Sequence, residues 1–264
     1  QDFANACSTV PTPVETTLRF VQLGAGPFHT CARTSGGAIW CWGESNYGLG
    51  DSAVTGESDS LIRVANVATF TTMAIGINHA CASGTDGQGY CWGGNYDGEL
   101  GRGAAAGFGF RPTPAPINSS AFIKRWAIGQ YHTCALTGAG EALCWGIGQS
   151  GQLGDSTTTA SQPDPVYVKT ALRFTQIAAA GSSTCALESG TGTAWCWGEN
   201  SSGQLGDGTT YDRLAPTPVL GGLTFRRLVM GTDFWYGGTA TTCGSSEDRF
   251  YCWGLLPQPL TFGE

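Results

Sequence analysis

The chain has 264 residues, of which 41 are glycine and only 12% are charged, and its formal net charge is −7. This acidic balance disfavours a phosphate-tracking surface, because nucleic-acid binding usually rests on clustered Lys and Arg, and we expect no nucleic-acid partner. The sequence also lacks a run of about 18 consecutive apolar residues, so we expect no membrane insertion.

The chain divides into three segments by pattern. Residues 1–10 precede any repeat and are expected to form a tail or a closing strand. Residues 11–254 carry five repeats, and residues 255–264 are expected to close the fold or to exchange with another chain. The chain begins with Gln1 and not with Met, which is compatible with a removed export signal.

Each repeat ends in Cys-Trp-Gly, and the intervals between successive copies are 50, 53, 52 and 56 residues. A period in this range indicates an array of one supersecondary unit. Short runs such as Phe20–Leu23 and Ala194–Trp197 are typical of strands, and no window has helical spacing. The sequence therefore predicts an all-β fold.

Ten of the eleven cysteines form pairs 9 to 11 residues apart that bracket a turn such as Ser35–Gly37. Such cysteines face each other across a hairpin within disulfide reach, which favours an oxidising, extracellular or cell-surface location. The spacing does not fit zinc, and we expect no metal or cofactor. The predicted bridges are Cys31–Cys41, Cys81–Cys91, Cys134–Cys144, Cys185–Cys196 and Cys243–Cys252.

All three histidines, His29, His79 and His132, occupy one repeat position. A catalytic group is needed once per site, so a periodic histidine favours a structural role, which we expect to be a hydrogen bond from the imidazole to a neighbouring turn backbone. No histidine then remains for a Ser-His-Asp triad or a Cys-His pair, and we expect no enzymatic activity.

The typical repeat has this order of parts: a strand, Gly-x-x-His-Thr-Cys-Ala, a hairpin, Cys-Trp-Gly and then Asn-x-x-Gly-Gln-Leu-Gly-Asp. This order is similar to the repeat of the regulator of chromosome condensation family, over about residues 11–254. The resemblance implies β-propeller blades of four strands, here about five with one disulfide in each. It implies no single activity, since one member acts on a small GTPase and a secreted bacterial relative inhibits β-lactamase. Seven blades are usual, so five predict a smaller closed ring that the proline-flanked end segments seal.

Within this repeat the tryptophan alternates with the cysteine, so the two side chains point to opposite faces of a blade. We expect the tryptophans to pack between blades, at Trp42, Trp92, Trp145, Trp197 and Trp253. In the Gly-x-Leu-Gly-Asp loops we expect the leucine to enter the same core. Asp51, Asp155 and Asp207 are expected to cap turn amides there.

Three stretches interrupt the repeat: Val54–Leu61, Arg102–Arg111 and Asp233–Tyr236. Exposed aromatic residues in such loops are typical anchors of protein or sugar recognition, although they could instead cover an incomplete last blade. The candidate contacts are Phe108, Phe110, Phe234, Trp235 and Tyr236.

Several residues match modification patterns of exported proteins. Asn118 and Asn200 begin N-glycosylation motifs, and Thr12, Thr113 and Thr217 each lie between two prolines, where O-glycosylation is a candidate.

The function that these patterns favour is a non-enzymatic extracellular structural or interaction protein, such as a repeating subunit of a surface appendage, filament or matrix. Its partner would be a second copy, joined head to tail, or a surface protein. Cys7 has no partner in a repeat and could bridge two chains or be buried. The alternative is a soluble secreted recognition module, either a lectin that binds glycans or an inhibitor of a secreted enzyme.

Overall fold

The computed structural model describes residues 10, 13–14, 16–44, 48–53, 56–65, 67–232, 240–247 and 249–255. The strands follow one another in antiparallel sheets that we call blades 1 to 5. Blade 1 comprises β1 (Phe20–Ala25), β2 (His29–Thr34), β3 (Ile39–Glu44) and β4 (Glu57–Arg63). Blade 2 comprises β5 (Phe70–Ile75), β6 (His79–Gly84), β7 (Gly89–Gly93) and β8 (Arg111–Pro116).

The later blades repeat this order. Blade 3 has β9 (Ile123–Ile128), β10 (His132–Thr137), β11 (Ala142–Gly146) and β12 (Gln162–Tyr167). Blade 4 has β13 (Phe174–Ala180), β14 (Ser183–Glu188), β15 (Ala194–Gly198) and β16 (Arg213–Pro218). Blade 5 has β17 (Arg227–Thr232), β18 (Ala240–Ser245) and β19 (Phe250–Gly254), so its described part is three-stranded.

The all-β propeller with one disulfide per blade is confirmed. The register places the paired cysteines directly opposite each other on the second and third strands, as at Cys134 and Cys144. The Cα atoms of every pair lie 4.1 Å apart, and the five bridges connect the predicted residues. The described helical structure is one short 3-10 turn, Ala104–Ala106, and no helix in this part of the chain is long and apolar enough to cross a membrane.

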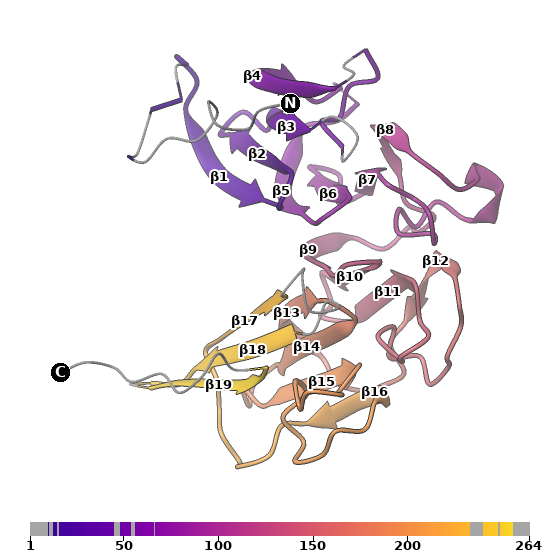
Figure 1. Cartoon of the computed structure of the whole chain (residues 1–264), viewed down its shortest axis with the longest axis vertical. Helices are drawn as coiled ribbons and strands as arrows, with labels where there is room; N and C mark the ends of the chain where they lie inside the picture. The colour runs from indigo at the N-terminus through magenta and orange to yellow at the C-terminus, as the bar shows by residue number, and fades with distance from the viewer. Residues whose placement is uncertain are drawn as a thin grey trace.

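The blades radiate from a common centre (Figure 1). The first strand of each blade lies innermost and the fourth lies at the rim, while blades 1 and 5 stand at the two ends of the arc. The inner ends of β1, β5, β9, β13 and β17 meet around a central hollow of about 260 Å³.

Four buried clusters hold the arc together, one between each pair of successive blades. Among the described residues no buried cluster joins blade 5 to blade 1, so this part of the chain does not form the closed ring that we expected. Most of the end segments expected to seal it, Cys7 included, lie outside the described residues. The fold is therefore a chain of four equivalent junctions with two end blades.

Candidate interaction surfaces

Each blade presents two chemically different faces. The disulfide face carries the two cysteines, and the tryptophan face carries the Trp of Cys-Trp-Gly. At the first junction Cys31, Cys41 and Ile39 of blade 1 pack against Met73 and Trp92 of blade 2. The same pairing of disulfide face with tryptophan face recurs at the other three junctions.

The tryptophan face also receives the glycine loop of the preceding blade. The indole N–H groups of Trp92, Trp145 and Trp197 donate to the backbone carbonyls of Gly48, Glu99 and Gln152, at 2.9, 2.7 and 3.0 Å. The loop leucines Leu49, Leu100, Leu153 and Leu205 are at most 1% exposed. A Cβ on Gly101 would lie 2.7 Å from Nε1 of Trp145, and φ there is +64°, so the loop passes the indole only as glycine. Trp and loop thus form one inter-blade contact.

Two histidines join blades through a hydroxyl group. Nε2 of His79 lies 2.7 Å from Oγ1 of Thr133, and Nε2 of His132 lies 2.9 Å from Oγ1 of Thr184. Thr133 in turn donates to the carbonyl of Glu99 at 2.8 Å. The expected partner, a turn backbone, was therefore wrong for these two histidines, because a threonine of the next blade stands nearer.

His29 lacks this partner, because Ala80 occupies in blade 2 the register position of Thr133. Both of its ring nitrogens are buried without a hydrogen bond in the described structure. Burial lowers the pKa values of His29 and His132 to about 4, and that of His79 to about 3. The three imidazoles are therefore neutral in the fold at physiological pH, in keeping with packing and not with proton transfer.

Among the described residues of these contacts, Glu99 is the one buried carboxyl group whose pKa is raised. It holds the loop position of Gln152 and Gln204, and it is 0% exposed. Its Oε2 accepts from the backbone N–H of Asp97 at 2.8 Å, but Oε1 has no described partner. Burial raises the pKa of Glu99 to about 7.

Among the described residues, no preceding blade covers the tryptophan face of blade 1. Leu23 is 67% exposed there, whereas Met73 and Leu228, at the equivalent positions of blades 2 and 5, are 5% and 1% exposed. Beside it lies a hollow of about 370 Å³ that Trp42 and Asp59 help to line. In blade 3, Pro163 stands at the position of Asp59. The loop of blade 2 packs against it there, since a Cβ on Gly98 would lie 2.7 Å from the Cα of Pro163. The hollow is thus a loop-binding place left open.

No following blade covers the disulfide face of blade 5 in the part of the chain that the structure describes. Phe250 is 85% exposed, whereas Ile39 at the same register position of blade 1 is 1% exposed. Val229 is 50% exposed, and its equivalent Ala127 is 6% exposed. Cys243 and Cys252 are half-buried, while the cysteines of the other four bridges are 0% exposed. Two apolar faces therefore remain uncovered at the ends of the arc.

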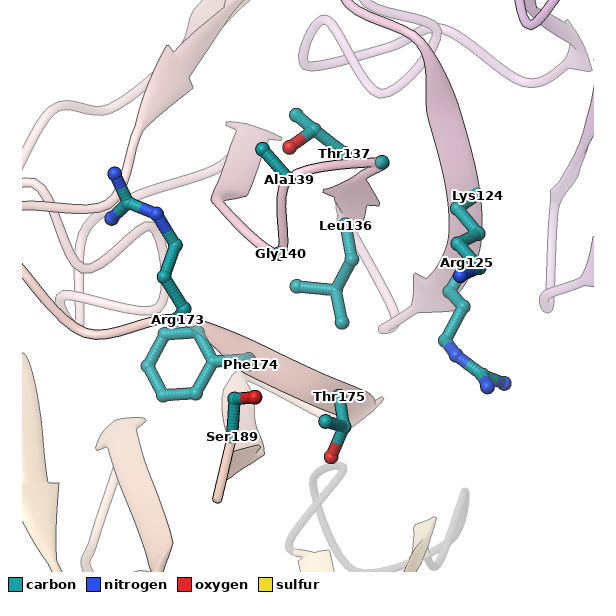
Figure 2. A pocket seen from close by; sticks show the side chains of 11 residues that line it. Lys124, Arg125, Leu136, Thr137, Ala139, Gly140, Arg173, Phe174, Thr175 and Ser189 are labelled. Carbon is teal, nitrogen blue, oxygen red and sulfur yellow. The ribbon is translucent and has the colours of Figure 1, made fainter. Parts of the chain in front are cut away.

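A second kind of surface is a hollow of about 260 Å³ between blades 3 and 4 (Figure 2). Arg173 lies on one rim, and Lys124 and Arg125 of β9 lie on the other. Arg173 pairs with Glu141 at 3.1 Å, while Lys124 and Arg125 are exposed and form no ion pair among the described residues. The hollow is therefore cationic.

The predicted loop contacts are only partly described. Phe108 is 52% exposed and Phe110 is half-buried, so the loop that follows β7 presents one aromatic ring to solvent. Phe234, Trp235 and Tyr236 lie outside the described residues. The first irregular stretch is not a free insertion, since residues from Glu57 onward belong to β4.

The modification sites divide by burial. Asn200 is 0% exposed, and its amide donates to Asp207, to the backbone carbonyl of Thr209 at 3.1 Å and to that of Tyr211 at 3.1 Å. It cannot carry a glycan in the fold, and that prediction was wrong. Asn118 and Thr113 are exposed and Thr217 is half-buried, while Thr12 lies outside the described residues.

Sequence reasoning missed Leu23, Val229 and Phe250, which the structure leaves exposed at the ends of the arc. Periodicity gave no signal for them, because the equivalent positions Met73, Ala127 and Ile39 are buried at the interior junctions. As for ligand chemistry, the described residues contain no group of three or more His, Cys, Asp or Glu placed to hold a metal ion.

Comparison with known protein families gives a single answer. The model of the Regulator of chromosome condensation (RCC1) repeat matches residues 86–136, 139–187 and 191–234, which is more than half of the chain. A second model of the same repeat matches residues 20–49, 123–152 and 174–204.

Among curated proteins, the chain is 34% identical over 195 residues to the mitochondrial RCC1 domain-containing protein RUG3 of Arabidopsis thaliana, covering 67% of this chain and 42% of that protein. It is 30% identical over 252 residues to the probable E3 ubiquitin-protein ligase HERC4 of Rattus norvegicus, covering 92% of this chain and 23% of that protein. The chain thus spans less than half the length of either relative.

Among solved structures, yeast RCC1 (Prp20) bound to Kap60 superposes with a TM-score of 0.76 at 20% identity, over 89% of this chain and 56% of that chain. Human WBSCR16 superposes with a TM-score of 0.73 at 19% identity, over 82% and 57% of the two chains. These superpositions support the blade architecture.

Proposed function

The chain belongs to the regulator of chromosome condensation repeat family, and from that premise we propose that it is a non-enzymatic protein-binding propeller whose partner is a second copy of itself. Propellers of this family serve protein interaction, as in the complex of yeast RCC1 with Kap60. The periodic histidines His79 and His132 lie inside the fold, where each forms a hydrogen bond with a threonine of the next blade. Binding is then the remaining role for its surfaces.

The observation that carries this proposal is the pair of uncovered end faces. Blade 5 offers the disulfide face with Phe250 and Val229, and blade 1 offers the tryptophan face with Leu23 and Trp42. These are the two halves of the contact that holds every interior junction together. Exposed apolar surface of this kind marks an interaction site, and two unlike complementary faces on one chain build a head-to-tail assembly.

The hollow beside Trp42 lies where the glycine loop of a preceding blade packs at the interior junctions, so we assign it to the blade 5 end of the neighbouring copy. Cys7, in the segment ahead of blade 1, could then lock the contact as an intermolecular disulfide.

The same proposal places the protein outside the cell or at its surface, as a repeating subunit of an appendage or matrix. Five disulfides support an oxidising compartment. The exposed ring of Phe108 favours the second candidate, a soluble recognition module that holds a surface protein or a glycan.

The test is the mass of the native protein against concentration, by sedimentation or by light scattering after chromatography. At about 500 mM salt, where exposed charges are screened, the proposal expects species heavier than 27.5 kDa that Leu23→Arg reduces to single chains. Tyr167→Arg is the matched control, since Tyr167 is 57% exposed on the rim strand of blade 3 and lies on neither end face. A wild-type protein that stays a single chain at high concentration would overturn self-assembly and leave the recognition module.

A further inference from the structure

Charged side chains are segregated between the two ends of the propeller. At the hairpin end, each second strand turns into the third and each fourth strand leads to the next blade, as at residues 138–141 and 168–173. At the loop end, each third strand continues through a glycine loop to the fourth, as at residues 147–161. The antiparallel order places the residues beside these connections at one end or the other. The tips of the glycine loops belong to neither end, because they return beside the residue that follows the fourth strand, where the backbone N–H of Lys169 donates to the carbonyl of Gly154 at 2.9 Å and that of Ala65 donates to Gly50 at 3.0 Å.

The hairpin end is basic. It carries ten described basic residues and four described acidic ones, and two of the four, Glu141 and Glu247, are paired with arginines. The basic residues are Arg19, Arg33, Arg63, Lys124, Arg125, Lys169, Arg173, Arg226, Arg227 and Arg249, and all except Arg33 are exposed. The other two acidic residues are Asp86 and Glu188.

The loop end is acidic. Seven acidic residues with described side chains lie there against two arginines, Arg111 and Arg213. Glu99 is the buried one among them. The accessible carboxylates are those of Glu44, Asp59, Asp97, Asp164, Glu199 and Asp212.

We propose that the acidic loop end of one copy docks on the basic hairpin end of another copy, with the hollow of Lys124, Arg125 and Arg173 receiving carboxylates (Figure 2). Each copy has a net charge of −7, so two copies repel in most orientations. Only the stacked orientation brings opposite charges together, and charge complementarity of this kind fixes orientation and raises the association rate.

This inference rests on the proposed function, in which the partner is a second copy, and it adds the axial contact. When blade 5 of one copy joins blade 1 of the next, the blades of successive copies continue the same arc around the propeller axis. Once the arc has gone around the axis once, the first blades already fill the plane of the propeller, so later blades must lie above them along the axis. The hairpin end of one turn then faces the loop end of the other, and the side-by-side and axial contacts belong to one helical assembly.

The experiment uses two charge-reversal chains. The first carries Lys124→Glu, Arg125→Glu and Arg227→Glu, so its hairpin end loses its excess of positive charge while its loop end stays acidic. The second carries Asp97→Lys, Asp164→Lys and Glu199→Lys, so both of its ends are basic. None of these six side chains lines the hollow beside Trp42 or belongs to a buried junction cluster. Asp164 accepts from the side-chain amide of Asn118 at 2.6 Å, a contact on the surface that its replacement removes. A control with Thr113→Glu and Tyr167→Glu changes net charge at the rim alone.

All chains are made on the Leu23→Arg background, which blocks the blade contact and leaves only the axial one. We expect the parent to associate at about 50 mM salt and to bind about tenfold more weakly at about 500 mM, because screening shortens the reach of exposed charges. Each charge-reversal chain alone should associate at least about tenfold more weakly than the rim control. An equimolar mixture of the two should recover the parent's association.

The outcomes separate the two proposals. If the charge-reversal chains associate as the rim control does, or if their mixture stays as weak as each alone, the axial contact is wrong while head-to-tail assembly stands. If the wild type and the Leu23→Arg chain have the same mass at about 500 mM salt, head-to-tail assembly is wrong. Recovery in the mixture then still supports the axial contact.

Discussion

Interior and end blades share one sequence pattern but differ in what covers them. The indoles of Trp92, Trp145 and Trp197 are 0% exposed, and each is hydrogen-bonded to the loop of the preceding blade. Trp42, which no preceding blade covers among the described residues, is only half-buried. A repeat therefore does not determine burial by itself, because half of each contact comes from the neighbouring repeat.

The difference also locates the binding surfaces. Leu23 and Leu228 are the same residue type at the same register position of β1 and β17, yet they are 67% and 1% exposed. Blade 4 covers Leu228, whereas no blade among the described residues covers Leu23. We expect a partner that supplies this neighbour to gain the burial that an interior junction already has.

The largest effect should come from removing an interior disulfide. Replacing Cys134 and Cys144 by alanine is expected to lower the free energy of unfolding by about 4 kcal/mol, from loop-closure entropy together with lost buried packing. The same change at the half-buried Cys243 and Cys252 should cost about 2 to 3 kcal/mol. Urea unfolding of the two double variants measures this, and equal losses would contradict the distinction between interior and end blades.

The exposed bridge should also open first. Under graded reductant, mass mapping is expected to find Cys243 and Cys252 alkylated before any other pair, because the other four bridges are 0% exposed.

The leucine pair gives the next effect. Leu228→Ala should lower the free energy of unfolding by about 3 kcal/mol, because it leaves a cavity between blades 4 and 5. Leu23→Ala should change it by less than about 0.5 kcal/mol in the single chain, since its side chain is already in solvent. Thermal or urea unfolding at low protein concentration compares the two, and similar losses would mean that blade 1 is covered by its own chain.

Glu99 makes one interior junction sensitive to pH. Its pKa is raised by burial to about 7, so the folded state favours the neutral acid. The stability that this acid contributes is full below the unfolded pKa of about 4.3 and is lost as pH rises through about 7. Glu99→Gln, which copies Gln152 and Gln204, should therefore stabilise the protein at pH 8 to 9 by at most about 3 kcal/mol.

The comparison with wild type at each pH isolates Glu99 from the buried histidines, whose lowered pKa values reduce stability as pH falls below about 6.5 in both proteins. Gln152→Glu is the converse variant and should introduce the same alkaline loss one junction further on. A stability difference between wild type and Glu99→Gln that does not change with pH would rule out this account of the junction.

The smallest effect is a repair. Ala80→Thr places a hydroxyl where Thr133 and Thr184 stand in later blades, so His29 gains the partner that it lacks. We expect about 1 kcal/mol of added stability, the usual net value of a buried hydrogen bond. Ala80→Val has the same shape without the hydroxyl and should give no gain, so a gain in both variants would assign the effect to packing.

Much of the fold was predictable because it repeats. The spacing of Cys134 and Cys144 around a glycine turn fixed a hairpin, a bridge and one blade, and the other four followed by periodicity. Asp155 and Asp207 accept from turn amides two residues on, at 2.9 and 3.0 Å, because a short Asp side chain reaches only local backbone.

The errors came where a residue was considered without its neighbours. Asn200 matched a glycosylation pattern of three residues, but the loop buries it as it buries Asn95 at the same repeat position. That recurrence in the sequence was a signal of a structural role. The exposure of Leu23 and Phe250 could not be predicted from periodicity, because it depends on how far the arc of blades extends in space.

The most direct test of the central claim mixes two chains that are each blocked at one end. Leu23→Arg blocks the tryptophan face of blade 1, and Phe250→Arg blocks the disulfide face of blade 5, so neither chain alone can form the blade contact. At about 500 mM salt, where exposed charges are screened, each should sediment as a single chain of 27.5 kDa. Their mixture should form a dimer with one copy of each and nothing larger, because only one open pair of faces remains. A mixture that stays monomeric while the wild type assembles would contradict head-to-tail binding through the end blades.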